Sequence, residues 1–151
     1  MSATELVADL ATKARTAART LSTATGAERK AALAAIAQAL ESRSAEILAA
    51  NEADMVNARA ENMHPQMQDR LLLTVERIKA IASGAREVAA LPDPLGQILR
   101  KSTLPNGLEL EQISVPFGVI GMVYEARPNV TVDAAVILLM SGNAALLRGS
   151  S

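Results

Sequence analysis

Cysteine and tryptophan are both absent from the 151 residues of this chain. Without cysteine the chain forms no disulfide, offers no thiolate to a metal and carries no cysteine nucleophile. Tyr124 and Phe117 are its only tyrosine and phenylalanine, so stacking on the bases of single-stranded nucleic acid is not expected. The formal net charge is -1, which gives no strong field toward nucleic acid or an anionic membrane. These shortages argue against disulfide-stabilised, thiolate-metal and nucleic-acid-binding proteins.

The sequence also lacks any long apolar run. The most apolar helical stretch, residues 130–140, is too short to cross a bilayer and contains Asp133. No basic region leads into an apolar run at the start, so a secretory signal is not indicated. Half of the residues are nevertheless hydrophobic, and this length suffices for one domain with a core. We therefore expect a cytoplasmic protein that does not bind membranes.

Residues 1 to about 91 have the apolar spacing of amphipathic helices. Ser2 with Glu5, and Thr25 with Glu28, have the spacing of a capping box, so one helix is expected to begin at each pair. The apolar stripes that we assign to the core are Leu6, Leu10, Ala14, Ala17 and Leu21 on the first helix, Leu33, Ile36, Ala37 and Leu40 on the second, and Ile78, Ile81, Ala85 and Val88 on the last.

Three later positions indicate further helix boundaries. Asn51 is expected to end one helix and to cap the next, with Asp54 three residues on. Pro65 fits the first turn of a short helix. Another helix is expected to begin at Thr74 or Val75.

Residues 91–96 end the helical part, because two prolines and a glycine in this segment do not continue a helix. Two extended segments, 97–104 and 108–115, then flank Pro105-Asn106-Gly107. Asn-Gly is the strongest short hairpin signal, since both residues tolerate positive φ. We expect a half-exposed β-hairpin able to pair with the sheet edge of a partner.

The remainder predicts a strand, a helix and a second strand, which together form a parallel βαβ unit. Residues 118–124 are a continuous apolar run, which favours a strand buried on both faces. A helix over 130–141 is expected to be capped by Asn129 or Thr131 and ended by Gly142. A second short, buried strand follows Gly142. Ligands of such sheets bind beyond the carboxyl ends of the strands.

The loop after the first strand carries the candidate chemistry. Arg127 is suited to hold a carboxylate or phosphate with two hydrogen bonds, and Asn129 to donate to an oxyanion. The start of the next helix adds free N–H groups and a positive dipole. The structural alternative is that Asn129 only caps the helix, Pro128 only sets the turn, and Glu125 and Arg127 form a surface pair.

The end of the second strand is the other candidate. Arg148 followed by Gly149 and a serine suits a phosphate or a ribose, because glycine lets the backbone approach closely; a solvated strand end is the alternative. No Gly-x-Gly-x-x-Gly motif is present, so a standard Rossmann phosphate turn is not indicated. His64, the only histidine, is expected at the surface, and no ligand spacing indicates a metal site.

The string Tyr-Glu-Ala-Arg-Pro-Asn-Val-Thr at 124–131, inside a longer run from Val115, closely resembles the γ-glutamyl phosphate reductases, also called glutamate-5-semialdehyde dehydrogenases. This family belongs to the aldehyde dehydrogenase superfamily. Segments 51–54, 69–74 and 93–96 resemble it as well, so the resemblance covers essentially the whole chain. It implies an α/β fold made of a helical part over 1–96, a bridging or oligomerisation hairpin over 97–115, and an incomplete NADP-binding βαβ unit over 116–151.

The resemblance implies NADPH-dependent reduction of γ-glutamyl phosphate to glutamate-5-semialdehyde in proline biosynthesis. In that family a thiolate attacks the acyl phosphate, phosphate leaves, and hydride from the cofactor reduces the thioester. The family also implies a homo-oligomer for the full-length enzyme and glutamate 5-kinase as a partner.

Site residues carry over from the resemblance position by position. The residues that line the site are then Tyr124, Glu125, Ala126, Arg127 and Asn129, with Asn129 as the candidate oxyanion donor, and those that meet NADP at the second strand are Arg148, Gly149 and Ser150. No catalytic residue is assigned, because the nucleophilic cysteine of the family lies beyond this chain. We therefore expect the front end of such an enzyme, inactive by itself.

Other interpretations remain open at the level of sequence. The chain could come from another acylating aldehyde dehydrogenase or from the reductase half of a bifunctional enzyme of proline synthesis. A different class is a non-catalytic helical interaction module, or a degenerate fragment, that uses the hairpin at Asn106 and Gly107 for assembly.

Overall fold

The computed structural model describes residues 2–125 and 127–149. Over these residues five helices precede a hairpin, and a strand, a helix and a strand follow it. The elements are α1 (Ala3–Thr23), α2 (Gly26–Ser42), α3 (Ser44–Ala60), α4 (Pro65–Leu71), α5 (Val75–Ala90), β1 (Ile98–Thr103), β2 (Glu109–Ile113), β3 (Val119–Val123), α6 (Pro128–Met140) and β4 (Ala144–Arg148). The predicted α/β class is confirmed. None of the helices in the described ranges is long and apolar enough to cross a membrane.

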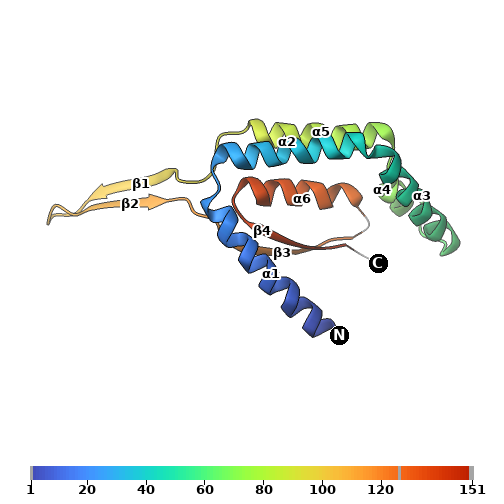
Figure 1. Ribbon diagram of the computed structural model, residues 1–151, viewed down its shortest axis with the longest axis horizontal. Coiled ribbons are helices and arrows are strands. Elements are labelled where there is room, and N and C mark those ends of the chain that lie inside the picture. The colour runs from blue at the N-terminus through green and yellow to red at the C-terminus, as the bar shows by residue number, and fades with distance from the viewer. Residues whose placement is uncertain (1, 126, 150–151) are drawn as a thin grey trace.

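The elements form layers around α6 (Figure 1). Helices α2 and α5 run side by side, and α6 lies against both of them. The strands β3 and β4 pair in parallel below α6, as predicted for a βαβ unit. Helix α1 packs on the opposite side of this small sheet, while the hairpin β1–β2 projects away from the layers.

The core consists of two clusters. In the larger one, α2 and α5 contribute small and branched side chains that meet the inner face of α6; its fully buried members are Leu33, Ala37, Ala82, Ala85, Val136 and Met140. In the smaller one, Ala14 and Ala18 of α1 pack against Ala144 of β4. Alanine at these contacts lets the helix backbones approach one another closely. The predicted core stripes of α2 and α5 are confirmed, whereas Leu6, Leu10 and Ala17 of α1 are exposed.

Both predicted capping boxes are present. The Glu5 N–H donates to Ser2 Oγ at 3.2 Å, and the Ser2 N–H donates to Glu5 Oε2 at 2.7 Å. Thr25 and Glu28 repeat this arrangement at the start of α2. These reciprocal bonds satisfy N–H groups that a helix start leaves without an intrahelical partner.

The hairpin forms where predicted, with a different turn. The Gly107 N–H donates to the Leu104 carbonyl oxygen at 2.8 Å, which closes a four-residue turn. Gly107 has a φ of 86°, but Asn106 does not have a positive φ. Asn106 instead accepts the Leu108 N–H on its side-chain oxygen at 3.1 Å. Pro105 sets the first central position of this turn, so only the glycine has to be left-handed.

Two predictions for the βαβ unit are wrong. Strand β3 is not buried on both faces: Val119 and Ile120 are half-buried, but Val123 is 83% exposed. Helix α1 packs against Val119 at the start of this strand, and within the described ranges β4 is the only strand that pairs with it. Strand β4 is itself only partly buried beyond Ala144. The end of α6 is as predicted, with a φ of 73° at Gly142.

The start of α6 also differs from the prediction. The helix begins at Pro128, and neither Asn129 nor Thr131 caps it, because both residues already lie within its first turn. Proline suits this position, since the first N–H of a helix has no intrahelical acceptor.

The predicted role of Asn51 is wrong as well, for a reason that concerns the site described below. Asn51 lies in the middle of α3 and is buried. Its side-chain N–H₂ donates to the Leu71 carbonyl oxygen at 2.9 Å, and its side-chain oxygen accepts the Leu73 N–H at 2.7 Å. One amide thus fixes the backbone that links α4 to α5.

An ion pair between a buried arginine and a partly exposed aspartate fixes the segment that enters the hairpin. The Arg29 side chain is 3% exposed, and its Nη2 donates to both carboxylate oxygens of Asp93 at 2.7 and 2.6 Å. The Leu95 N–H, with a further contribution from Arg29, holds the pKa of the Asp93 carboxyl below its usual value. A lowered folded pKa means that this stabilisation is present at neutral pH and is lost as the pH falls through the lowered value.

Gly26 leaves no room for a side chain beside this pair. A Cβ at Gly26 would lie 2.3 Å from Asp93 Oδ2, so we expect Gly26→Ala to displace the carboxylate from Arg29 and to lower the free energy of unfolding by about 1–3 kcal/mol. Gly84→Ala in α5 is the matched control. Nothing lies within 4 Å of a Cβ there, so alanine should stabilise the helix by about 0.5–1 kcal/mol. Urea unfolding measures the free energy of unfolding of both variants. Equal changes in Gly26→Ala and Gly84→Ala would show that a side chain at Gly26 does not disturb the ion pair of Arg29 with Asp93.

Removal of the Asn51 amide should loosen the α4–α5 link. We expect Asn51→Ala to lower the free energy of unfolding by about 1–3 kcal/mol, because two partly buried backbone groups lose their partners. Asn57→Ala, an exposed position on the same helix, should change it by no more than about 0.5 kcal/mol. Amide hydrogen exchange at Leu73 reports the same bond directly; unchanged protection in Asn51→Ala would refute this role.

Candidate functional site

The two strand ends meet at one edge of the small sheet. The Tyr124 N–H donates to the Arg148 carbonyl oxygen at 3.0 Å, which extends the parallel pairing by one residue beyond β3. The Tyr124 ring lies over Gly149, where a Cβ would be 3.5 Å from the ring. The loop before α6 and the end of β4 are therefore neighbours, as expected for the ligand-binding edge of a parallel sheet.

The loop is also tied to the first turn of α6. The Tyr124 hydroxyl lies 2.6 Å from Thr131 Oγ1, so the two hydroxyls share a hydrogen bond. The Asn129 side-chain N–H₂ donates to Asp133 Oδ2 at 3.0 Å. These bonds orient Tyr124 and Asn129 with respect to the helix start. The candidate oxyanion donor thus has one of its N–H groups held by a carboxylate.

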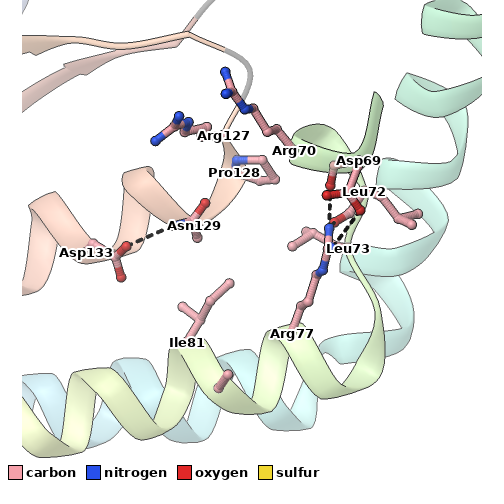
Figure 2. Close-up of a pocket in the computed structure, with 11 residues that line it drawn as sticks. Asp69, Arg70, Leu72, Leu73, Arg77, Ile81, Arg127, Pro128, Asn129 and Asp133 are labelled. Carbon is pink, nitrogen blue, oxygen red and sulfur yellow. Dashed lines mark hydrogen bonds and ion pairs between the residues drawn. The ribbon is translucent and has the colours of Figure 1, made fainter. Parts of the chain in front are cut away.

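Three hollows surround this loop, and Arg127 borders all of them. The first, of about 500 Å³, lies between the α4–α5 link and the start of α6 (Figure 2). The second, of about 340 Å³, lies between α3 and the Tyr124 and Gly149 backbone region. The third, of about 400 Å³, lies beside the end of β3 and includes Glu125. The site is thus formed by the helical part and the βαβ unit together.

The structure gathers most of the predicted site residues. Tyr124, Glu125, Arg127, Asn129 and Gly149 each border at least one of these hollows. Arg148 ends β4 with an exposed side chain and does not border them. Ala126 and Ser150 lie outside the described residues. No ion pair between Glu125 and Arg127 is present within the described ranges.

Charged residues of α4 and α5 were not among the predicted site residues. Arg77 lies inside the first hollow and is held there, because its Nη2 donates to Asp69 Oδ1 at 2.8 Å and its Nη1 to the Leu72 carbonyl oxygen at 2.8 Å (Figure 2). Arg70 lies at the rim of the same hollow. The only sequence signal for this segment was that residues 69–74 resemble the family.

The first hollow has a net positive lining. Three arginines and two aspartates border it, and each aspartate already accepts a hydrogen bond, from Arg77 or from Asn129. Positive charge at the start of a helix favours an anion, because the N-terminal N–H groups carry a partial positive charge as well.

The Tyr124–Thr131 bond gives a direct test of how the loop is held. We expect Tyr124→Phe and Thr131→Val each to lower the free energy of unfolding by no more than about 1 kcal/mol, since the bond is exposed. The double variant should be no less stable than the worse single variant, because both changes remove the same bond. Thermal unfolding of the four proteins measures this coupling, and strictly additive losses would show that the bond does not form in solution.

Curated relatives that resemble this chain in sequence carry the same name. No protein-family model matches the chain. It is 52% identical over 147 residues to a γ-glutamyl phosphate reductase of Kineococcus radiotolerans, and 54% identical over 141 residues to one of Geobacillus thermodenitrificans. These matches cover 97% and 93% of this chain and 34% of each relative. The chain therefore spans about one third of the length of the curated relatives that it matches.

Solved structures agree with the sequence matches. A crystal structure of γ-glutamyl phosphate reductase from Thermotoga maritima superposes with a TM-score of 0.89 at 39% identity, over 93% of this chain and 34% of that one. The Saccharomyces cerevisiae protein of the same name gives a TM-score of 0.88 at 30% identity, over 100% of this chain and 38% of that one. The fold described above matches the N-terminal region of these structures.

Proposed function

Since this chain is homologous over nearly its whole length to the N-terminal third of γ-glutamyl phosphate reductases, we propose that it forms the cofactor-side entrance of such an enzyme. The reaction of the whole protein is then the NADPH-dependent reduction of γ-glutamyl phosphate to glutamate-5-semialdehyde in proline biosynthesis. The observation that carries this proposal is the meeting of the two strand ends at Tyr124 and Gly149, beside a hollow bordered by Arg127.

The residues at the end of β4 fit a dinucleotide. Arg148 is exposed at the strand end, where a guanidinium suits a ribose phosphate. Gly149 has no side chain, so the Tyr124 ring packs close to its backbone. Both residues border the second hollow, so a ligand group there meets the ring and the strand end together. When bound, NADPH supplies the hydride that reduces the substrate; this chain binds and orients the cofactor.

The start of α6 and Arg127 serve the substrate side of the same loop. Arg127 borders all three of the hollows described above, so one guanidinium can hold an anionic group on either side of the loop. Asn129 keeps a second N–H on the side-chain nitrogen that donates to Asp133, and this N–H is the candidate donor to an oxyanion. The chain contains no cysteine, so the thiolate that attacks the acyl phosphate is supplied from outside it.

Self-association belongs to the same proposal. The hairpin carries exposed apolar side chains on both strands, among them Ile98, Leu99, Leu110 and Ile113, and an exposed strand edge is suited to pair with another sheet. A homo-oligomer and a glutamate 5-kinase partner remain predictions from the family resemblance. A cytoplasmic location remains a prediction from the sequence, which shows no secretory signal and no long apolar run.

Calorimetric titration of the chain with NADPH tests the cofactor part. We expect saturable binding that Arg148→Gln weakens at least about tenfold, roughly 1.4 kcal/mol, because the guanidinium meets the 2′-phosphate or the ribose. NADH should bind less tightly than NADPH if the 2′-phosphate is the contact. Arg100→Gln on the projecting hairpin makes the same change of charge and should leave the affinity unchanged.

An assay with glutamate-5-semialdehyde, phosphate and NADP should give no turnover from the chain alone, because it has no thiolate nucleophile.

In the calorimetric titration, absence of NADPH binding, or equal affinities in the wild type and Arg148→Gln, would overturn the cofactor assignment.

A further inference from the structure

Arg70 is one of the charged residues of the site to which the family resemblance did not assign a role. It is exposed on α4 and borders both the first and the third hollow, as Arg127 does. Figure 2 shows the two guanidinium groups at the same rim, one from α4 and one from the loop before α6. The two residues are 57 positions apart in sequence, and they border the same two hollows because the helical part packs on the βαβ unit.

The carboxylates near this rim are already engaged, except for Glu125. Asp69 accepts from Arg77, and Asp133 accepts from Asn129. The hydrogen bond that the structure gives the Arg70 side chain, within the described ranges, is a contact of Nη1 with Met67 Sδ at 3.6 Å. A thioether is a weak acceptor. The guanidinium of Arg70 is therefore available to a ligand.

The position of Arg70 separates it from the expected cofactor side. The hollow that includes Gly149 is bordered by Arg127 but not by Arg70. Of the three hollows around the loop, the two that Arg70 borders contain no residue of β4 and not Gly149. A ligand between Arg70 and Arg127 thus lies on the side of the loop away from the end of β4.

We propose that Arg70 and Arg127 together bind one anionic group, a carboxylate or a phosphate, of the acidic substrate. This inference rests on the proposed function and adds a substrate-specificity residue to it. Two guanidinium groups at one rim repel each other weakly through solvent, and an anion between them replaces this repulsion by two charge-assisted, planar contacts. Asn51 and Arg77 position the contact indirectly, because they hold the α4–α5 link next to Arg70.

Inorganic phosphate and L-glutamate are suitable probes of this pair, since each offers one of the two anionic groups. In ¹H–¹⁵N spectra at constant ionic strength, we expect phosphate to shift the Nε–H signals of Arg70 and Arg127 with a single dissociation constant. Arg70→Gln should raise this constant at least about fivefold, and Arg70→Lys should fall between, because an ammonium keeps the charge without the planar fork. Arg100→Gln should leave the constant unchanged.

Competition separates the sources of the anion. If L-glutamate displaces phosphate, the group of the substrate that binds the two arginines is a carboxylate. If L-glutamate does not compete with phosphate, that group is the acyl phosphate. Either result places the substrate at Arg70 and Arg127. If NADPH shifts the same signals and Arg70→Gln weakens NADPH as much as phosphate, the pair binds the dinucleotide and the inference is overturned. Equal phosphate affinity in the wild type and Arg70→Gln, with unchanged circular dichroism, overturns it as well.

These readouts also distinguish this inference from the proposed function. NADPH binding that depends on Arg148, without phosphate binding at Arg70, keeps the cofactor assignment and rejects the substrate pair. Phosphate binding that depends on Arg70, without any NADPH binding, keeps the substrate pair and rejects the cofactor assignment.

Discussion

The packing of α6 is the constraint on which the other features depend. Val136 and Met140 of this helix complete the cluster of α2 and α5, while its other side contacts β4. One apolar helix thus joins the helical layer to the sheet, with burial worth about 25 cal/mol per Å² of apolar surface. Because the helix cannot shift without opening one of these contacts, its first turn is held across the first hollow from the α4–α5 link. The site lies at this junction.

Arginine has three different roles in this small protein. Arg29 is buried and paired with Asp93, which fixes the path of the chain into the hairpin. Arg77 donates to Asp69 and to backbone oxygens, so it shapes the first hollow without being free to bind. Arg70 and Arg127 stand at the rim. The planar group with five donors suits all three roles, and the available acceptors decide which one each arginine takes.

Local signals in the sequence predicted the elements well, because the bonds behind them join residues three or four positions apart. Ser2 with Glu5 starts α1, Thr25 with Glu28 starts α2, and Gly142 ends α6. The same reasoning placed the loop of Arg127 at the carboxyl end of a strand. It went wrong for Asn51, whose partners at Leu71 and Leu73 are 20 and 22 residues away.

The sequence by itself therefore determined the order of helices and strands, the parallel βαβ unit, the resemblance to one family and the loop that carries Arg127. Only the tertiary structure decided that Arg70 joins Arg127, that Arg77 is occupied by Asp69, and that β3 is largely exposed. The physical reason is distance along the chain. The hydrogen bonds of helix caps and turns join residues that are close in sequence, so the sequence predicts them. A shared hollow or a covered strand depends on how α6 packs between layers whose residues are far apart in sequence.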